Sequence, residues 1–173
     1  MKKSNNIIVT SNQRSALIWL WLSVLVIVLD LATKQLADAF LLYAKPLHIL
    51  PFLDFTLLYN RGAAFSFLAD HGGWQRWFFA VISIGVSVAL VVWLKKLPRK
   101  SAWLACALSL VLGGAIGNLY DRLVYGHVID FISVHWQASY FPAFNIADSA
   151  ISIGAVMLII DALFESRKAK PTL

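Results

Sequence analysis

Four long apolar runs constrain this chain more than any other feature of its sequence. They lie at about residues 16–36, 77–94, 102–123 and 144–164. Each approaches or exceeds the roughly 20 residues that a helix needs to cross the hydrocarbon core of a bilayer. Since 60% of the 173 residues are hydrophobic and 14% are charged, the composition is too apolar for an ordinary soluble domain. The sequence therefore predicts an all-α membrane protein, with four transmembrane helices forming a single integral membrane domain over residues 1–173.

The positions of the basic residues predict how these helices are oriented. Ten of the fifteen Lys and Arg residues lie in three short stretches, at residues 2–14, 95–100 and 166–170. With four spans, all three stretches fall on the same side, and the positive-inside rule makes that side cytoplasmic. We therefore expect a multi-pass protein with both termini inside. The net charge of +6 is then a sign of topology and not of nucleic-acid binding.

The segment between the first two spans, at about residues 39–73, is long enough to form a small structure outside the membrane. Its sequence "HILPFLDFTLLYNRGAAFSFL" is rich in aromatic and aliphatic residues, with a turn-forming Asn-Arg-Gly at residues 60–62. This pattern favours short strands or a hairpin, followed by an interfacial turn that ends at "DHGGW". The predicted fold thus includes a small extracytoplasmic β-structured platform between helices 1 and 2.

Polar side chains from four separate parts of the chain are predicted to reach one depth, near the outer leaflet. In chain order they are Asp30, Thr33, Lys34, Asn118, Asp121, Arg122, Asp130, Asn145 and Asp148. A carboxylate in hydrocarbon costs at least about 2.5–3.5 kcal/mol, so ionisable groups inside membranes usually have a function. Because randomly placed polar residues are not expected to align in this way, the pattern predicts a functional site on the outer side.

Two of these residues suggest a chemistry. Asp148 lies only a few residues into the last span, and the eighteen residues that separate it from Asp130 allow the loop to fold back over the bundle. When two carboxylates share a site, the ionised one can take a proton from water while the protonated one polarises a carbonyl. The pair therefore suggests hydrolysis of an amide at the membrane surface.

Simpler explanations exist for single residues. Asp148 can be an acidic residue favoured by the helix dipole, Ser149 a serine bonded to its own helix, and Asp130 a solvated loop residue. The glycines of "GGAIGNLYDRL", including Gly117, are typical of a helix-packing seam. Asp161, at the inner end of the last span, is best explained as part of a solvated helix end.

Metal and serine chemistry fit the sequence poorly. His127, Asp130 and His135 are close together in the chain, but they do not form a recognised ligand spacing. Ser133 and Ser149 have histidines nearby in sequence, but neither lies in a Gly-x-Ser-x-Gly elbow. The sequence therefore predicts that the site needs no metal and no cofactor.

With these residues in place, the sequence resembles the bacterial lipoprotein signal peptidases, also called signal peptidase II. The resemblance extends over about residues 16–164. The matching motifs are "DLATK" at 30–34, "NRGAAFS" at 60–66, "GNLYDR" at 117–122, "VIDFI" at 128–132 and "FNIADS" at 144–149. Each motif alone is weak, but their order on four spans is specific.

The resemblance implies an activity and a set of site residues. Such enzymes are aspartic endopeptidases, a class of hydrolase, in the bacterial cytoplasmic (inner) membrane. They remove signal peptides from diacylglyceryl-modified prolipoproteins by cutting before the lipidated cysteine at the outer face. The catalytic pair maps to Asp130 and Asp148. Positions that bind substrate or support the site map to Asp30, Lys34, Asn60, Gly117, Asn118, Asp121, Arg122, Asn145 and Ala147.

The expected partners follow from the same resemblance. They are the prolipoprotein substrates, membrane lipid and globomycin-type inhibitors. Within the site, Asn60, Asn118 and Asn145 are candidates for hydrogen bonds to the substrate backbone. Arg122 is a candidate for binding a substrate carbonyl or for orienting Asp121 and the loop that carries Asp130.

Two other functions remain as alternatives. In a small proton- or ion-coupled transporter, Asp30, Asp121 and Asp148 would form a relay, which should reach both sides of the membrane. The predicted polar groups instead gather on one side. In a scaffold subunit, the polar residues would only hold partner helices, and Asp→Asn changes would alter assembly more than any reaction.

Overall fold

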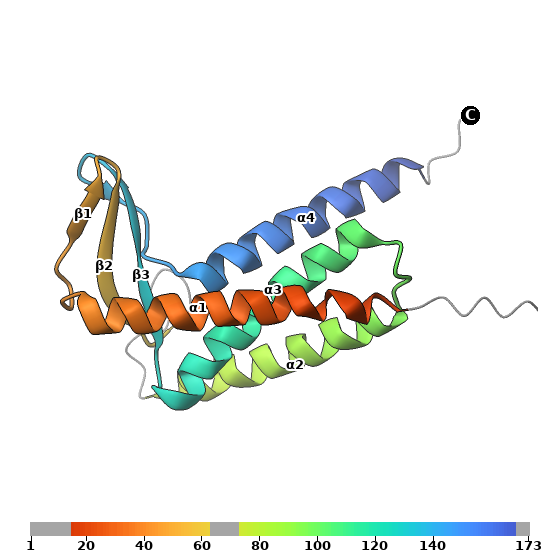
Figure 1. Cartoon of the computed structure of the whole chain (residues 1–173), viewed down its shortest axis with the longest axis horizontal. Helices are drawn as coiled ribbons and strands as arrows, with labels where there is room; N and C mark the ends of the chain where they lie inside the picture. The colour runs from red at the N-terminus through yellow and green to blue at the C-terminus, as the bar shows by residue number, and fades with distance from the viewer. Residues whose placement is uncertain (1–14, 63–72, 169–173) are drawn as a thin grey trace, which may run out of the picture.

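The computed structural model describes residues 15–62 and 73–168 of the chain as four long helices and one small sheet (Figure 1). A short 3-10 turn, η1 (Ala16–Trp19), leads into the first long helix. The long helices are α1 (Leu20–Phe40), α2 (Trp74–Lys96), α3 (Ala102–Val124) and α4 (Ile146–Lys168). The strands are β1 (Leu47–Leu50), β2 (Leu53–Asn60), β3 (Val128–Trp136) and β4 (Ser139–Tyr140).

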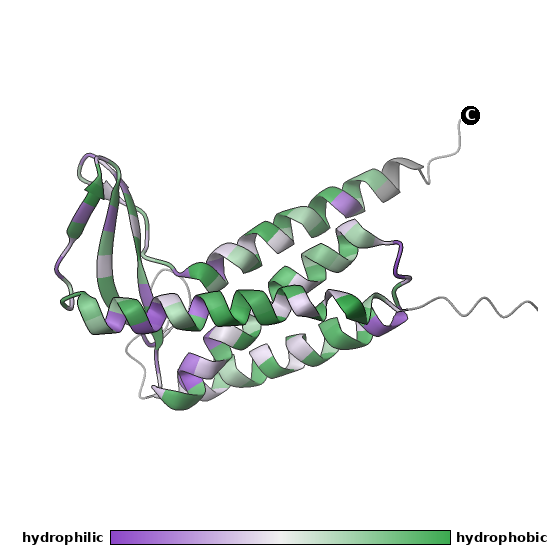
Figure 2. Ribbon diagram, viewed as in Figure 1, coloured by the Kyte–Doolittle hydropathy of each residue, from purple (hydrophilic) through white to green (hydrophobic). Residues whose placement is uncertain are grey.

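The helices have the length and composition of membrane spans. Four stretches qualify in the described part of the chain, namely Ala16–Phe40, Trp74–Lys96, Ala102–Val124 and Ile146–Phe164. Figure 2 shows that these helices are hydrophobic over most of their length. Large apolar side chains also point outward from the bundle, which suits contact with lipid tails. The four predicted spans are therefore confirmed, and the chain is a multi-pass membrane protein.

Several predicted boundaries differ from those in the structure by one to four residues; α4, for example, runs from Ile146 to Lys168 instead of from about 144 to 164. The first helix continues to Phe40, four residues beyond the predicted end, and α2 begins at Trp74 instead of residue 77. The end of the first span was predicted too early because Lys34 and Asp38 interrupt the apolar run in the sequence. In the structure Lys34 is fully buried and paired inside the bundle, so it does not end the helix.

Helix α3 is the centre of the bundle and packs against the three other helices. In its most apolar stretch 56% of the residues are buried, against 17–22% in the other spans. Its glycines allow this close packing. A Cβ atom at Gly113 would lie 2.9 Å from the Ser23 carbonyl oxygen of α1, and one at Gly117 would lie 2.5 Å from the Asp30 carboxylate. The predicted glycine seam is therefore present, and Gly117 also makes room for a charged side chain.

The sheet is antiparallel, with strand order β1-β2-β3-β4. Strands β1 and β2 confirm the hairpin predicted after the first span. However, β3 and β4 come from the segment between α3 and α4, so the platform is not built only from residues between helices 1 and 2. In the pairing of β2 with β3, Leu58 lies opposite Asp130 and Asn60 lies opposite Val128. The interfacial turn expected before residue 74 lies outside the described residues.

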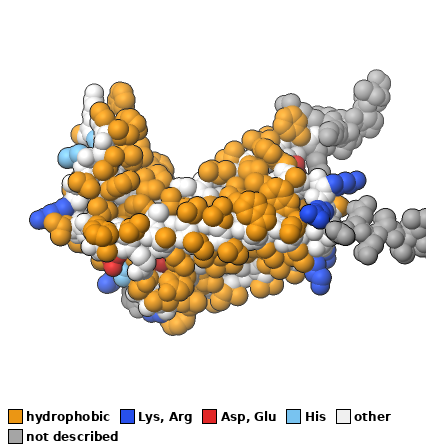
Figure 3. Space-filling view, in the orientation of Figure 1, with side chains coloured by type: hydrophobic (Ala, Val, Ile, Leu, Met, Phe, Trp, Pro, Cys, Tyr) orange, Lys and Arg blue, Asp and Glu red, His pale blue; other side chains and the backbone are white. Residues whose placement is uncertain are grey.

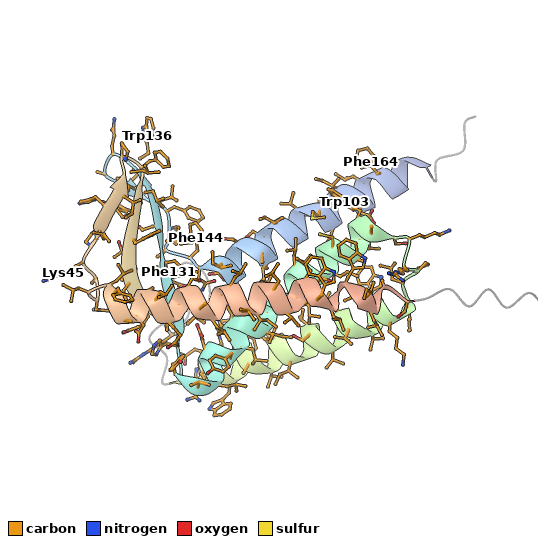
Figure 4. All side chains as sticks on the ribbon, viewed as in Figure 1. Lys45, Trp103, Phe131, Trp136, Phe144 and Phe164 are labelled. Atoms are coloured by element: carbon orange, nitrogen blue, oxygen red, sulfur yellow. The ribbon has the colours of Figure 1, made fainter. Side chains whose placement is uncertain are left out.

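An apolar cluster joins the sheet to the bundle. It consists of Ala37 from α1, Leu57 from β2, and Ile129 and Phe131 from β3, all at most 7% exposed. Figure 4 shows Phe131 where the sheet meets the end of α1, while Trp136 lies at the far tip of the sheet. The cluster fixes β3, and therefore Asp130, over one end of the helices.

The glycine seam gives a test of the packing. We expect Gly117→Ala to lower the free energy of unfolding by about 1–3 kcal/mol, because the added methyl group overlaps the Asp30 carboxylate. Gly85→Ala in α2 is the matched control, since a Cβ atom there meets nothing within 4 Å. Thermal unfolding of the purified protein in detergent measures both. Equal melting temperatures for the two variants would contradict the role given to Gly117.

Candidate active site

A buried ammonium group lies at the centre of the site. The Lys34 Nζ atom is 2.7 Å from Asp30 Oδ2, 2.9 Å from Asn118 Oδ1 and 2.9 Å from Asp121 Oδ2. All three charged side chains are 0% exposed. The contacts with Asp30 and Asn118 are hydrogen bonds, and the contact with Asp121 is an ion pair. The three buried charges are therefore paired and form one connected unit between α1 and α3.

The two carboxylates paired with Lys34 also hold the backbone of two other segments. Asp30 Oδ1 accepts a hydrogen bond of 2.8 Å from the backbone N–H of Ala147, at the start of α4. Asp121 Oδ2 accepts one of 3.1 Å from the backbone N–H of Ile129 in β3. Ala147 directly precedes Asp148, and Ile129 directly precedes Asp130. The Lys34 unit therefore positions both segments that carry the predicted pair.

A reciprocal cap at the start of α4 fixes Asp148. The side chain of Asn145, the residue just before the helix, accepts a hydrogen bond of 2.9 Å from the Asp148 backbone N–H. In return, Asp148 Oδ2 accepts one of 3.3 Å from the Asn145 backbone N–H. This is the capping-box arrangement, made here by Asn and Asp. The Ser149 hydroxyl donates to the Asn145 carbonyl at 2.9 Å, so this serine is bonded to its own helix, as its simpler explanation proposed.

Three asparagine amides direct N–H donors at the two aspartates. Asn145 Nδ2 lies 2.8 Å from Asp130 Oδ1, and Asn60 Nδ2 lies 3.1 Å from Asp130 Oδ2. Asn118 Nδ2 donates to Asp148 Oδ1 at 2.7 Å. Since Asn145 contacts Asp130 through its side chain and Asp148 through its backbone, it bridges the pair. The asparagine amides thus contact the carboxylates themselves.

The two aspartates differ in their surroundings. Asp130 is 3% exposed, whereas Asp148 is partly exposed at the wall of a cavity. Burial, followed by the charge of Asp148, raises the pKa of the Asp130 carboxyl from 3.8 to about 7. The explanation of Asp130 as a solvated loop residue is therefore wrong. A carboxyl group with this pKa can carry a proton at neutral pH.

A cavity of about 550 Å³ opens in front of the pair. Asp130 and Asp148 both line it, and its apolar wall continues along α4 to Ile151 and Ile153. Figure 3 shows the molecule hollowed between the sheet and α4. Arg122 also lines the cavity. Its guanidinium group donates hydrogen bonds to the carbonyl oxygens of Asn118 and Gly62, at 3.2 and 3.3 Å, and lies over the ring of Phe79. The site is thus an open chamber with two carboxyl groups and one guanidinium group.

The structure brings all the sequence-predicted site residues to this end of the bundle. Those that contact one another or line the cavity are Asp30, Lys34, Asn60, Asn118, Asp121, Arg122, Asp130, Asn145, Ala147 and Asp148. Gly117 contributes only the space for Asp30. Asp161 lies more than three helical turns along α4 from Asp148, outside the residues that line the cavity. The part of the "NRGAAFS" motif beyond Gly62 lies outside the described residues.

A second polar cluster was missed by the sequence analysis. Asp54 of β2 is 0% exposed and lies 2.7 Å from His48 Nδ1 and 3.5 Å from His135 Nε2. Its three members come from three neighbouring strands, whose register the sequence does not reveal. His135 also stacks on Tyr140, with ring centroids 4.7 Å apart. Within the residues that the structure describes, neither this cluster nor any other group of three His, Cys, Asp or Glu could hold a metal ion.

Comparisons with known proteins identify the family of this site. The family model "Signal peptidase (SPase) II" matches residues 22–164. The chain belongs to the signal peptidase II family. A lipoprotein signal peptidase of Pseudomonas putida is 62% identical over 156 residues, which cover 89% of this chain and 91% of that protein. Another, of Pseudomonas aeruginosa, is 61% identical over 153 residues, covering 87% and 90%.

Solved structures agree with this assignment. One bacterial membrane enzyme superposes with a TM-score of 0.80 at 32% identity, over 90% of this chain and 93% of the other. A second superposes with a TM-score of 0.73 at 33% identity, over 84% and 92%. The chain is therefore a membrane-bound peptidase, as the sequence motifs predicted. Nothing in the comparisons supports the transporter alternative.

The Lys34 unit gives the second test. We expect Lys34→Met to lower the free energy of unfolding by about 3–5 kcal/mol, because it leaves the buried carboxylates of Asp30 and Asp121 without their cation. The control is Lys45→Met, since Lys45 is exposed in the loop before β1 (Figure 4). Thermal unfolding in detergent compares the two. A Lys34→Met protein as stable as the control would show that the ammonium group does not hold the site together.

Proposed function

We propose that the chain is an aspartic endopeptidase that removes signal peptides from diacylglyceryl-modified prolipoproteins by cutting before the lipidated cysteine. Membership of the signal peptidase II family supports the substrate class. The observation that carries the aspartic mechanism is the bridging of Asp130 and Asp148 by Asn145 at the wall of one cavity. When two carboxyl groups are held in this way, one can act as the general acid and the other as the general base.

The different burial of the two aspartates assigns their roles. Asp130, with a pKa of about 7, holds the proton and donates a hydrogen bond to the carbonyl oxygen of the bond to be cut. Asp148 is more accessible at the wall of the cavity and accepts N–H donors from Asn118 and Asn145, and we assign it the role of the base. It takes a proton from water as the water oxygen attacks the carbonyl carbon. The proton then passes to the leaving amine as the C–N bond breaks.

The remaining polar residues position this pair. We assign Asn60, Asn118 and Asn145 to holding the carboxylates, because their side-chain N–H groups already contact them. Arg122 lines the cavity and is placed to contact a substrate carbonyl. The apolar wall along α4 suits the hydrophobic signal segment and the acyl chains of the substrate. Globomycin-type inhibitors would occupy the same chamber.

Replacing each aspartate tests the mechanism directly. Asp130→Asn and Asp148→Asn retain the side-chain size but remove the carboxyl proton chemistry, so each should abolish cleavage of a diacylglyceryl-modified prolipoprotein in detergent. Because the two residues act as a unit, the double variant should be scarcely slower than either single one. Asp161→Asn, on the same helix but away from the cavity, is the control and should retain activity. Cleavage near the wild-type rate by a folded Asn variant would refute the proposal.

The proton held by Asp130 predicts a pH dependence. As the pH rises through about 7, Asp130 loses its proton and the rate should fall, since both carboxyl groups are then charged. The proposed mechanism also needs one ionised carboxylate to accept the proton of water, so the rate should fall again at low pH. The hydrogen bond from Asn60 lowers the pKa of Asp130, so Asn60→Ala should move the alkaline limb to higher pH. A pH profile of kcat/KM that is identical in both proteins would contradict this assignment, since kcat/KM reports the pKa values of the free enzyme.

We also propose that the site faces the outside of the bacterial inner membrane and that both termini are cytoplasmic. The support is the separation of charge: Lys95 and Lys96 lie at the end of α2, whereas the sheet and Asp130 lie at the opposite end of the bundle (Figure 1). A reporter fused after residue 173 should behave as cytoplasmic, and one inserted beside Lys45 as external. An external C-terminus would reverse the assignment.

A further inference from the structure

A second cavity, of about 650 Å³, lies over the sheet beside the first. Asp130 lines both cavities, as do Asn60 and the short segment of residues 141–143. The two cavities therefore meet at the carboxyl group that is assigned the proton. A polypeptide that is cut at this point must continue in two directions from it, and the structure provides a space in each direction.

The two cavities differ in their lining. The first runs along α4, where Ile151 and Ile153 make it apolar at the depth of a membrane span. The second is lined by Thr56, Leu58, Tyr59 and Asn60 of β2. It also has hydroxyl groups from neighbouring segments, namely those of Tyr43, Ser133 and Tyr140. The second cavity is thus suited to a polar chain, and the first is suited to an apolar one.

The hydroxyl groups of the second cavity can bind a peptide backbone. Tyr59 donates its own proton to Asp38 Oδ1 at 2.7 Å, and this bond raises the pKa of the Tyr59 hydroxyl. Its oxygen can therefore accept a backbone N–H. Thr56 and Tyr140 each offer both a donor and an acceptor. Among the described residues that line the cavity, Asp130, which is assigned the proton, is the only acidic or basic one, which favours recognition of an uncharged segment through its backbone.

From this geometry we infer that the cavity over the sheet binds the extended segment that follows the cut, that is, the first residues of the mature lipoprotein after its lipidated cysteine. This inference rests on the proposed function, because it requires cleavage at Asp130. The apolar signal segment would occupy the cavity along α4. The volume of the second cavity lies within the range of about 300–1,000 Å³ found for ligand pockets, so a short peptide segment has room. The cavity over the sheet thus adds affinity for the chain on one side of the cut.

The test uses two diacylglyceryl-modified substrates with the same signal peptide. One continues for about six residues, or ~20 Å of extended chain, beyond the lipidated cysteine. The other ends at that cysteine, which carries a C-terminal amide. The wild type should cleave the longer one with a higher kcat/KM. Thr56→Val and Tyr140→Phe each remove one hydroxyl group, so each should lower kcat/KM for the longer substrate roughly three- to tenfold. Neither should change kcat/KM for the truncated substrate.

Ser139→Ala is the matched control, because Ser139 is exposed on β4 but lines a different cavity with Phe52 and Trp136. It should leave kcat/KM unchanged for both substrates. Equal cleavage of the two substrates by the wild type would overturn the inference while leaving the proposed function intact. The same conclusion would follow if Thr56→Val and Tyr140→Phe slowed both substrates equally. Failure to cleave either substrate would refute the proposed function itself, and the inference with it.

Discussion

The site depends on one buried ammonium group, that of Lys34, held between the carboxylates of Asp30 and Asp121. Burying three charges in the interior of a membrane protein is unfavourable unless all of them are paired and hydrogen-bonded. Once they are paired, each carboxylate still has capacity to accept another hydrogen bond. Asp30 uses it for the backbone of α4, and Asp121 uses it for the backbone of β3. Through these carboxylates a single cation connects α1, α3, β3 and the start of α4, and Asp130 and Asp148 each directly follow one of the bonded residues.

This arrangement brings the carboxyl groups of Asp130 and Asp148 to one site but gives them different surroundings. Asp148 lies at the start of a helix and at the wall of the cavity, where its carboxylate accepts a hydrogen bond from the backbone N–H of Asn145. Asp130 lies on β3, beside the apolar cluster that contains Phe131. Burial of its carboxyl group raises its pKa and so favours the neutral form. Asn145 contacts both groups and prevents them from turning apart. The raised pKa of Asp130 therefore comes from where the fold places this residue.

Much of this could be predicted from the sequence, and the limits have physical causes. The four spans follow from hydropathy, and the convergence of Asp30, Asp121 and Asp148 follows from topology. By contrast, β3 and β4 were not predicted, because β3 is stabilised by pairing with residues of β2, which are distant in sequence, and the two-residue β4 pairs in turn with β3. The contacts of the asparagines with the carboxylates also depend on tertiary geometry, as does the His48–Asp54–His135 cluster across three strands. Sequence order gives the depth of a polar residue in a membrane but not the atom that it contacts.

The position of the sheet explains why a site of this kind can serve a substrate that is itself held in the membrane. Strand β3 crosses the end of the bundle and continues beyond it, so the Asp130 carboxyl group lies where the hydrophobic helices end and the sheet begins (Figure 1). Phe144 lies at this junction, with backbone hydrogen bonds to Phe131 and Ile132, and it ties the start of α4 to the sheet (Figure 4). The open space is therefore bounded by α4 on one side and by the sheet on the other. Under the proposed function, the apolar part of the substrate would lie along α4 between lipid tails, and its polar part would extend over the strands.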